Sequence, residues 1–241
     1  MLNILANERL KLKRNKLIPM CTLIAIMLPI AMIIADVSAK NATASTFTII
    51  EWVNRLVLPI QVIVYPVLSG FVITFLIQKE YVERTMINTL TAPTNRIKLV
   101  LGKYIIWSLW VVVLTLLILL ITYGGVYLLF GKTQFLENFY EITELCLKTG
   151  ILNLLSMSPI LIICILQRQI FYPSLLFSCL VSGIGFVGLY WSETIRNVIP
   201  WSAVTSITFL NSDVLLPYVS VICCYICGLA FSFYSFNRQN L

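Results

Sequence analysis

The chain contains 241 residues, of which 59% are hydrophobic, 11% are charged and none is histidine, and its formal net charge is +7. Soluble domains have an apolar share of about 45 to 50%, so this composition, with a mean hydropathy of +0.93, excludes a soluble domain and indicates an integral membrane protein. The lack of histidine excludes an imidazole base, a Ser-His-Asp triad and a zinc-protease helix.

The apolar residues form six runs that contain no charged residue, each 18 to 27 residues long. A helix needs about 20 residues to span a bilayer, and a backbone exposed to lipid must form a helix or a closed barrel. Barrel strands alternate in polarity over about ten residues, which these runs do not. The sequence therefore predicts an all-α integral membrane protein, with residues 1–241 as a single transmembrane domain and six helices at 17–35, 56–77, 104–130, 149–166, 170–192 and 214–236.

Lysine and arginine are distributed unequally between the connections of these helices. Twelve lie on the side of the N-terminus, mostly in residues 1–16 and in the loop 78–103, and five lie on the other side. Because basic residues near membrane helices are retained in the cytoplasm, we expect both termini and the loop 78–103 to be cytoplasmic.

The first half of the loop 78–103 has the pattern of an amphipathic helix that continues the second span. Apolar residues at i, i+4 and i+8 share one face. The other side carries a glutamate four residues before an arginine, an order that favours a helix. The apolar face consists of Val82, Met86 and Leu90, and the charged side consists of Glu80, Glu83 and Arg84.

Pro93 ends this helix, because proline lacks an amide donor and restricts Ala92 before it to an extended conformation. Thr94 can cap the next helix, which carries Arg96 and Lys103 back towards the third span. The loop is thus predicted to form a short helical hairpin below the membrane. The alternative is an ordinary solvated loop that anchors the topology through its positive charge.

On the outer side, residues 131–148 combine an apolar face with an acidic one. The apolar face holds Phe135, Phe139, Ile142 and Cys146, and the acidic face holds Glu137, Glu141 and Glu144. One interpretation is an interfacial helix with a solvated rim. The other is an acidic entrance that attracts cationic peptides. The later connection, 193–213, is also amphiphilic, and we expect it to dip into the outer leaflet.

The fifth run contains GIGFVG at 183–188, which matches the dinucleotide-binding fingerprint in its letters. That fingerprint must follow a strand and open a helix, whereas this segment lies inside a predicted membrane helix. The favoured interpretation is a face for close helix packing, made by the small residues Ser178, Ser182 and Gly185.

Charged residues are absent from all six runs, and the two aspartates, Asp36 and Asp213, flank the predicted spans. Ion-driven transporters use charges inside the membrane as relays, so any transport by this chain should draw its energy from another subunit. The sequence shows no set of residues for catalysis or for metal binding. We therefore expect neither an enzyme nor a metal site.

The segment EYVERTMINTLTAPTNRIKLVLGK, residues 80–103, resembles a motif of ABC-2 type transporter permeases. The matching positions are Glu80, Arg84, Thr85, Leu90, Pro93, Thr94, Arg96 and Lys103. The N-terminal segment NERLKLKRNK, followed by a span that contains Pro29, is similar to the start of small permeases that protect Gram-positive bacteria from lantibiotics or bacitracin.

The resemblance implies that the hairpin is a coupling helix, which docks into a groove of a separate ABC ATPase. Its apolar face would fill the groove and its charges would contact the rim. The residues in this role are Glu80, Val82, Glu83, Arg84, Thr85, Met86, Leu90, Pro93 and Arg96. The ATPase dimer would bind ATP and magnesium, so no cofactor is expected in this chain. A second six-helix permease, a copy or a paralogue, would complete the transporter.

The resemblance also implies an elbow helix along the inner leaflet within residues 1–16. Leu2 and Leu5 would face the acyl chains. Anionic lipid would be met by the basic residues, which are Arg9, Lys11, Lys13, Arg14 and Lys16. The same basic residues are equally consistent with a simple topology anchor.

The sequence thus predicts the permease subunit of an ABC exporter in a bacterial cell membrane, which expels an amphiphilic peptide antibiotic such as a lantibiotic or bacitracin. Its expected partners are the ATPase dimer, a second permease, membrane lipid and the peptide, and not nucleic acid. The main alternative is a non-transporting scaffold or sensor that holds a cytoplasmic partner through the loop 78–103. A third class, a membrane enzyme acting on lipids, lacks a convincing catalytic set.

Overall fold

A computed structural model describes residues 16–39, 47–82, 96–167, 170–210 and 214–238. Every regular element within these residues is a helix, and they contain no strand. Six helical segments of the described chain are long and apolar enough to cross a membrane. The prediction of an all-helical chain with six membrane-spanning helices is therefore confirmed.

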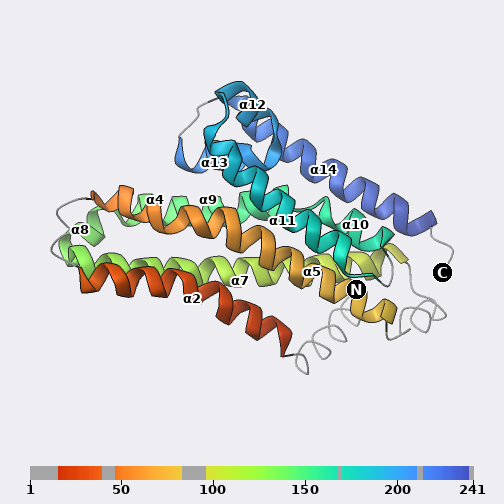
Figure 1. Ribbon diagram of the computed structural model, residues 1–241, viewed down its shortest axis with the longest axis horizontal. Helices are drawn as coiled ribbons and strands as arrows, with labels where there is room; N and C mark the ends of the chain where they lie inside the picture. Colours follow the sequence, from red (N-terminus) through yellow and green to blue (C-terminus); the bar gives the residue numbers. More distant parts are fainter. Residues whose placement is uncertain (1–15, 40–46, 83–95, 168–169, 211–213, 239–241) are drawn as a thin grey trace.

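Consecutive spanning segments run in opposite directions (Figure 1). They are formed by α2 (Leu17–Ser38); α4 (Ile49–Pro59), η1 (Ile60–Val64) and α5 (Tyr65–Val82); α7 (Arg96–Phe130); α9 (Phe139–Ser156) and α10 (Ile160–Leu166); α11 (Tyr172–Val187) and η2 (Gly188–Tyr190); and α14 (Leu215–Arg238). Three shorter helices lie in the connections: α8 (Lys132–Glu137), α12 (Glu193–Val198) and α13 (Pro200–Phe209).

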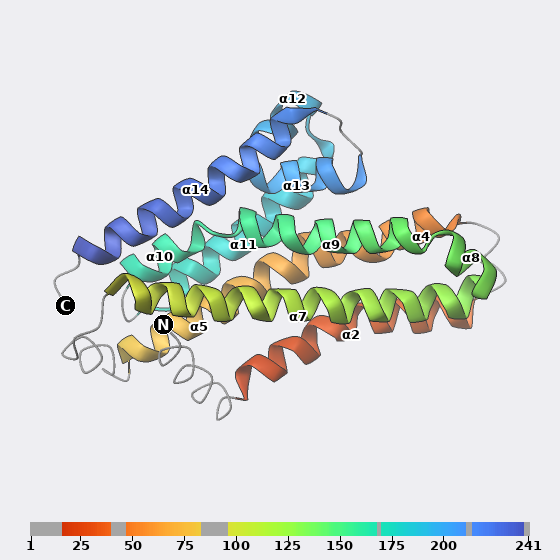
Figure 2. The same cartoon turned by 180° about the vertical axis from the view of Figure 1, so that it is seen from behind.

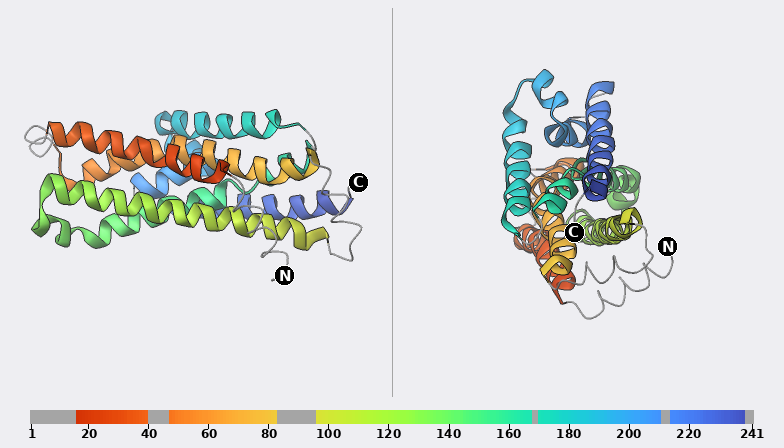
Figure 3. Two further views of the ribbon diagram at one scale, coloured as in Figure 1. Left: turned by 90° about the horizontal axis from the view of Figure 1, so that it is seen from below. Right: turned by 90° about the vertical axis from the view of Figure 1, so that its right-hand side faces the viewer.

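The spanning helices pack around a core rich in large side chains. α5 packs against α7, α10 and α11, and α7 packs against α2 and α9. α2 and α7 lie side by side near α8 and diverge towards the start of α2 (Figures 1 and 2), and Figure 3 shows the bundle from two further sides. Trp52, Tyr65 and Trp107 are almost completely buried between these helices. α14 lies on the other side of α10 and also contacts α13.

The two ends of the bundle differ in charge. The starts of α2 and α7 and the ends of α5 and α14 lie at one end, with α8 at the opposite end (Figures 1 and 2). The first end, called the basic end below, carries Lys16, Lys79, Lys103 and Arg238. The opposite end, called the acidic end, carries six acidic residues and four basic ones, namely Asp36, Glu51, Glu137, Glu141, Glu144 and Glu193 with Arg55, Lys132, Lys148 and Arg196.

The second spanning segment begins earlier than its apolar run predicts. It starts at Ile49, seven residues before the predicted start at 56, because Thr48 and Glu51 form a capping box. The Thr48 amide donates to the Glu51 carboxylate over 2.9 Å, and the Thr48 hydroxyl accepts from the Glu51 amide. This reciprocal pair satisfies amide donors of the first turn, so charged residues there are compatible with helix.

The fourth spanning segment also begins earlier, at Phe139 instead of 149. Ile142 and Cys146 lie on the face of α9 that packs against the core, and both are buried. The interfacial helix expected over 131–148 is therefore wrong in its extent. Only α8 is separate, and the residues from Phe139 onwards belong to the spanning helix, because the backbone stays α-helical without a break from Phe139 to Ser156.

The connection between the fifth and sixth spanning segments folds back into the bundle. α12 and α13 lie beside the upper parts of α11 and α14 in Figure 2, and α13 packs against α9, α11 and α14. Residues 202–208 of α13 are all buried, and four of these seven are serine or threonine. A polar helix of this kind is stable within a membrane protein where other helices surround it.

Two charged residues, one acidic and one basic, are buried in the described spanning helices, where the sequence predicts none. Asp36 of α2 is 7% exposed, accepts a hydrogen bond from Trp52 Nε1 (2.8 Å) and pairs with Arg55 (3.3 Å). Lys103 of α7 is 3% exposed, and its Nζ donates to the Leu76 carbonyl oxygen (3.0 Å). The expectation of charge-free spans is wrong at these positions, because the helices continue beyond the apolar runs and neighbouring helices supply polar partners there.

Candidate functional site

Most of the predicted ATPase-coupling residues lie outside the described residues, namely Glu83, Arg84, Thr85, Met86, Leu90 and Pro93. α5 carries Glu80 and Val82 in its last turn, and α7 begins at Arg96. The side chain of Val82 is 53% exposed at the basic end. The structure thus describes the two helices that flank the coupling segment 78–103, while the hairpin itself stays a prediction.

The two flanking helices are joined by hydrogen bonds from α7 to the backbone of α5. Lys103 Nζ donates to the Leu76 carbonyl oxygen (3.0 Å), and Trp107 Nε1 donates to the Ser69 carbonyl oxygen (3.1 Å). Both donor side chains are buried. Because a buried ammonium or indole N–H is costly without an acceptor, these bonds fix the position of α5 relative to α7.

On its other side α5 is tied to α10 and α11. Gln78 Nε2 donates to the Cys164 carbonyl oxygen of α10 (2.7 Å), and Thr74 Oγ1 donates to Ser174 Oγ of α11 (2.8 Å). Gln167, just after α10, donates to the same Ser174 hydroxyl (2.7 Å) and accepts from the Ser174 amide (2.9 Å). A displacement of α5 would therefore be transmitted to both neighbours.

Of the residues predicted to face the inner leaflet, the structure describes Lys16. It immediately precedes α2, and its side chain is exposed at the basic end. The remaining members lie outside the described residues, and they are Arg9, Lys11, Lys13 and Arg14. The elbow helix therefore stays a prediction.

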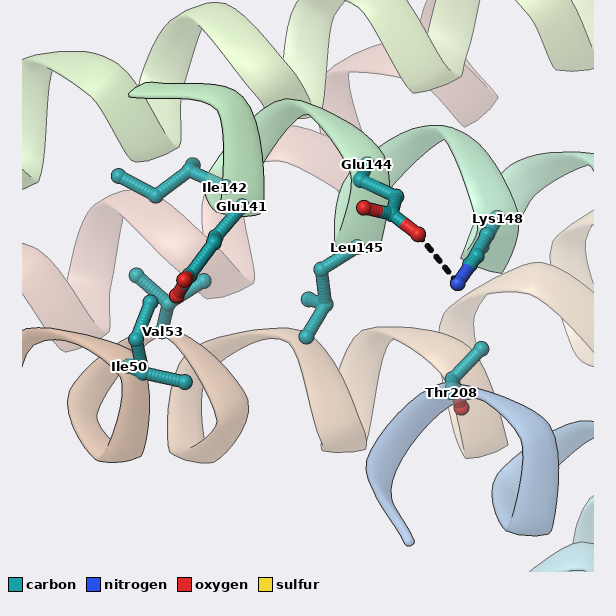
Figure 4. Close-up of a pocket in the computed structure, with 8 residues that line it drawn as sticks. All are labelled: Ile50, Val53, Glu141, Ile142, Glu144, Leu145, Lys148 and Thr208. Atoms are coloured by element: carbon teal, nitrogen blue, oxygen red, sulfur yellow. Dashed lines mark ion pairs between the residues drawn. The ribbon is translucent and has the colours of Figure 1, made fainter. Parts of the chain in front are cut away.

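A pocket of about 300 Å³ lies at the acidic end between α4, α9 and α13 (Figure 4). Apolar side chains of α4 and α9 form part of its wall, and charged or polar groups come from α9 and α13. The lining residues are Ile50, Val53, Glu141, Ile142, Glu144, Leu145, Lys148 and Thr208. An apolar wall beside a few charged groups suits a ligand that is itself amphiphilic.

The three glutamates of the predicted acidic entrance do not share one site. Glu141 and Glu144 line this pocket, and Glu144 forms an ion pair with Lys148 one turn further on (2.5 Å). Glu141 extends towards α4 in Figure 4 and has no ion pair with another described residue. Glu137 instead lines a second pocket, of about 330 Å³, between α4, α7 and α8.

A family profile described as ABC-2 family transporter protein matches residues 4–188, from the N-terminal segment into the fifth spanning helix. The chain belongs to the ABC-2 family of transporter permeases. The protein named Bacitracin transport permease protein BCRB, from Bacillus licheniformis, is 27% identical to this ABC-2 permease over 187 residues, which make up 72% of the present chain and 84% of that relative. No solved structure shows a significant match.

ABC-2 permeases are membrane subunits of transporters and are not themselves catalytic, and the present permease is a multi-pass bacterial membrane protein. The matched range includes both flanks of the coupling segment and all the α9 residues of the acidic-end pocket. Within the described parts of the permease, no group of three or more His, Cys, Asp or Glu side chains could hold a metal ion.

Small residues of α11 form its contact with α5 in this ABC-2 permease. Ser178 is buried against Gly70 of α5, where an added Cβ would lie 1.8 Å from Ser178 Oγ. Gly185 is buried beside Val62, whose side chain would lie 3.6 Å from a Cβ at this position, whereas Ser182 is half-buried. The buried stripe of α11 consists of Ser174, Ser178, Val181 and Gly185.

Three polar residues whose side chains form hydrogen bonds between helices are not among the site residues predicted from the sequence. Lys103 and Gln78 are assigned by the sequence to a loop, and Gln61 to an apolar run. The signal that could have found them is the residue type itself. A glutamine within a membrane helix needs a hydrogen-bonding partner, because burying its amide alone is costly.

Proposed function

We propose that this chain is the membrane subunit of an ABC exporter, that a separate ATPase supplies its energy, and that its substrate is an amphiphilic peptide antibiotic of the bacitracin or lantibiotic kind. One observation carries the proposal. The chain is similar to a relative named as a bacitracin transport permease over 84% of that relative's length, and its family implies an ABC ATPase partner. The transporter would protect its host by removing the peptide from the membrane.

The charge difference between the two ends supports a cytoplasmic location for the basic end. Lysine and arginine near the ends of membrane helices are retained in the cytoplasm, and the sequence places twelve of them on the side of this end and five on the other. Both termini, the elbow segment 1–16 and the coupling segment would then lie inside. The pocket lined by Glu141 would face the outside.

The hydrogen bonds of α5 support the proposal that the ATPase moves the membrane helices by pushing on the coupling segment. The ATPase dimer, which would bind ATP and magnesium, would push on residues 78–103. Because α5 is bonded to α7 through Lys103 and to α10 and α11 through Gln78 and Thr74, the push would move four helices together. A second permease, a copy or a paralogue, would enclose the transport path.

The acidic-end pocket supports a substrate with both basic and apolar groups. Glu141 has a carboxylate without an ion pair among the described residues, and Ile50 and Val53 face the same pocket. Carboxylates attract cationic ligands over several ångströms, and an apolar wall binds their aliphatic groups. Lantibiotics and bacitracin offer such a combination of groups.

The proposal is tested by purifying the chain from its native membrane and identifying the proteins that accompany it. We expect an ATPase with a Walker sequence. Met86→Asp, which places a charge on the apolar face of the coupling segment, should abolish both ATPase co-purification and protection against bacitracin and nisin. Met86→Leu, which keeps that face apolar, is the matched control. Intact assembly together with intact protection in Met86→Asp would overturn the proposal.

The scaffold or sensor alternative gives a different result in the same experiment. A cytoplasmic partner would still accompany the chain and would still be lost in Met86→Asp. However, a partner ATPase made inactive by substitution in its Walker sequence would leave protection unchanged, because a scaffold needs the partner's presence and not its hydrolysis.

A further inference from the structure

The second spanning segment contains a rare irregularity. Between α4 and α5, residues Ile60–Val64 form a π-helix directly after Pro59. Proline removes one backbone hydrogen bond and crowds the preceding turn, and a π-turn accommodates an extra residue in the helix, frequently at functional sites. Gln61 is the polar side chain in this turn.

Gln61 contacts the folded-back helix α13. It is 2% exposed, and the hydroxyl of Thr208, which is 5% exposed, donates to Gln61 Oε1 over 2.8 Å. The two residues are 147 positions apart in the chain. The bond therefore joins the middle of the second spanning segment to the connection between the fifth and sixth.

The Thr208 hydroxyl has one proton and two acceptors, since the Val204 carbonyl oxygen also lies at 2.8 Å. If the Gln61 amide is turned over, Nε2 donates to the hydroxyl, the hydroxyl donates to Val204, and both bonds form. In either orientation one polar atom of the buried amide has no hydrogen-bond partner among the described residues. Gln61 lines a pocket of about 10 Å³, together with Asn153, Ser156 and Thr205. That volume suits one water molecule.

Thr208 also lines the 300 Å³ pocket at the acidic end. In that pocket Thr208 faces the side of α9 that carries Lys148 (Figure 4). One residue thus contacts Gln61 and also forms the α13 wall of that pocket. From Gln61 the second segment continues as α5 to the coupling segment. Contacts therefore connect the basic end to the acidic-end pocket through α5, Gln61 and Thr208.

We propose that Gln61 is a positioning residue for transport. Its hydrogen bond to Thr208 holds α13 against the second spanning segment, so that a movement of α5 driven from the coupling segment displaces the α13 wall of the acidic-end pocket. The inference rests on the proposed function, because it requires that force enters through residues 78–103. It adds the element by which that force reaches the pocket.

In this proposal the π-turn is the element with two arrangements that such coupling requires. If its extra residue were accommodated elsewhere in the segment, the turn would become α-helix, and the following helix would shift by about 1.5 Å along its axis and rotate by about 100°. Gln61 lies within this turn, so a change there moves its amide. α13 follows, because the bond to Thr208 is buried and a broken bond would leave polar groups without partners.

The experiment uses the complete permease–ATPase complex with Gln61→Met, Thr208→Val and the double variant. Both substitutions keep side-chain size and remove the hydrogen bond. Thr149→Val is the matched control, because Thr149 of α9 is also buried, lies outside both pockets and donates to the Leu145 carbonyl oxygen of its own helix (2.8 Å). The readouts are the amount of co-purified ATPase, its basal rate, its stimulation by bacitracin and nisin, and cellular protection.

We expect normal assembly and basal hydrolysis, with peptide stimulation and protection reduced by about fivefold or more in each single variant. The double variant should lose no more than either single one, since both remove the same bond. Thr149→Val, and Thr208→Ser, which keeps the hydroxyl, should resemble the unmodified protein.

Full stimulation and protection in Gln61→Met and Thr208→Val would overturn the inference, as would an equal loss in Thr149→Val. If the valine variant fails to accumulate, Thr208→Ser decides: a loss of stimulation at a normal complex level contradicts a role for the hydroxyl. Failure of the proposed function is distinguishable, because the unmodified protein would then show no ATPase partner or no ATPase-dependent protection.

Discussion

Trp52 donates a hydrogen bond of 2.8 Å from its indole nitrogen to the carboxylate of Asp36 and thereby joins α2 to the second spanning segment inside the bundle. Arg55 approaches the same carboxylate at 3.3 Å. The Trp52 ring also packs edge-on against Phe130 at the end of α7, with 6.1 Å between ring centroids. This pair of residues therefore anchors three helices at the acidic end.

Removal of the Asp36 carboxylate should destabilise the protein. Asp36→Ala leaves the buried indole N–H of Trp52 without its acceptor, at a cost of about 1 to 3 kcal/mol, and we expect a lower Tm of the purified protein in detergent. Asp36→Asn keeps an acceptor and should lose less. Glu193→Ala, at an exposed acidic residue near the same end, is the control. Equal Tm values for all three variants would contradict this role of Asp36.

The contact between α5 and α11 depends on the absence of a side chain at residue 70. Gly70→Ala places a Cβ 1.8 Å from Ser178 Oγ and 2.9 Å from Ile160 Cδ1, so the helices must separate, at a cost of about 1 to 3 kcal/mol. Thermal unfolding should show the loss. Gly124→Ala, where an added Cβ meets nothing within 4 Å, should be neutral or stabilising.

A second substitution distinguishes a clash at Gly70 from a loss of backbone freedom. Adding Ser178→Gly removes the side chain that the new Cβ meets, so part of the lost stability should return. No recovery in the double variant would show that the cost of Gly70→Ala arises elsewhere.

The bond from Lys103 to α5 should matter for coupling to the ATPase. Lys103→Met keeps the aliphatic length but removes the donor to the Leu76 carbonyl oxygen, so α5 is held less firmly beside the coupling segment. We expect protection against bacitracin to fall by about fivefold or more, in line with the value of a buried charged hydrogen bond. Lys132→Met, an exposed lysine at the acidic end, is the control. Unchanged protection at normal complex levels would refute the prediction.

Charge reversal at the acidic end should affect protection differently at each of the three glutamates. Glu141→Lys introduces repulsion into the 300 Å³ pocket and should weaken protection against the cationic peptide nisin, most strongly at low salt because exposed charges are screened. Glu144→Lys also breaks the pair with Lys148. Glu137→Lys, in the other pocket, should have the smallest effect. Equal effects of all three on protection would point to the total charge and not to the pocket.

The sequence alone determined the class of the protein, its six spanning helices and its resemblance to ABC-2 permeases. Hydropathy and helix length are local properties, and a bilayer imposes a length of about 20 residues on any helix that crosses it. The apolar runs therefore locate all six helices, and the predictions differ from the structure only in where the helices begin and end. Thr48 and Glu51 extend one helix outwards, and α9 continues through Glu141, Glu144 and Lys148.

Only the tertiary structure decided which polar residues meet. Asp36 with Trp52, Lys103 with Leu76 and Gln61 with Thr208 are pairs whose members lie 16 to 147 positions apart, and hydropathy contains no information about partners at such separations. The folding back of α13 is the clearest case. A run rich in serine and threonine is predicted as an outer loop. In the structure Arg196 and Gln61 form hydrogen bonds with its hydroxyl groups, and α9, α11 and α14 pack against it, so burial inside the bundle becomes the stable arrangement.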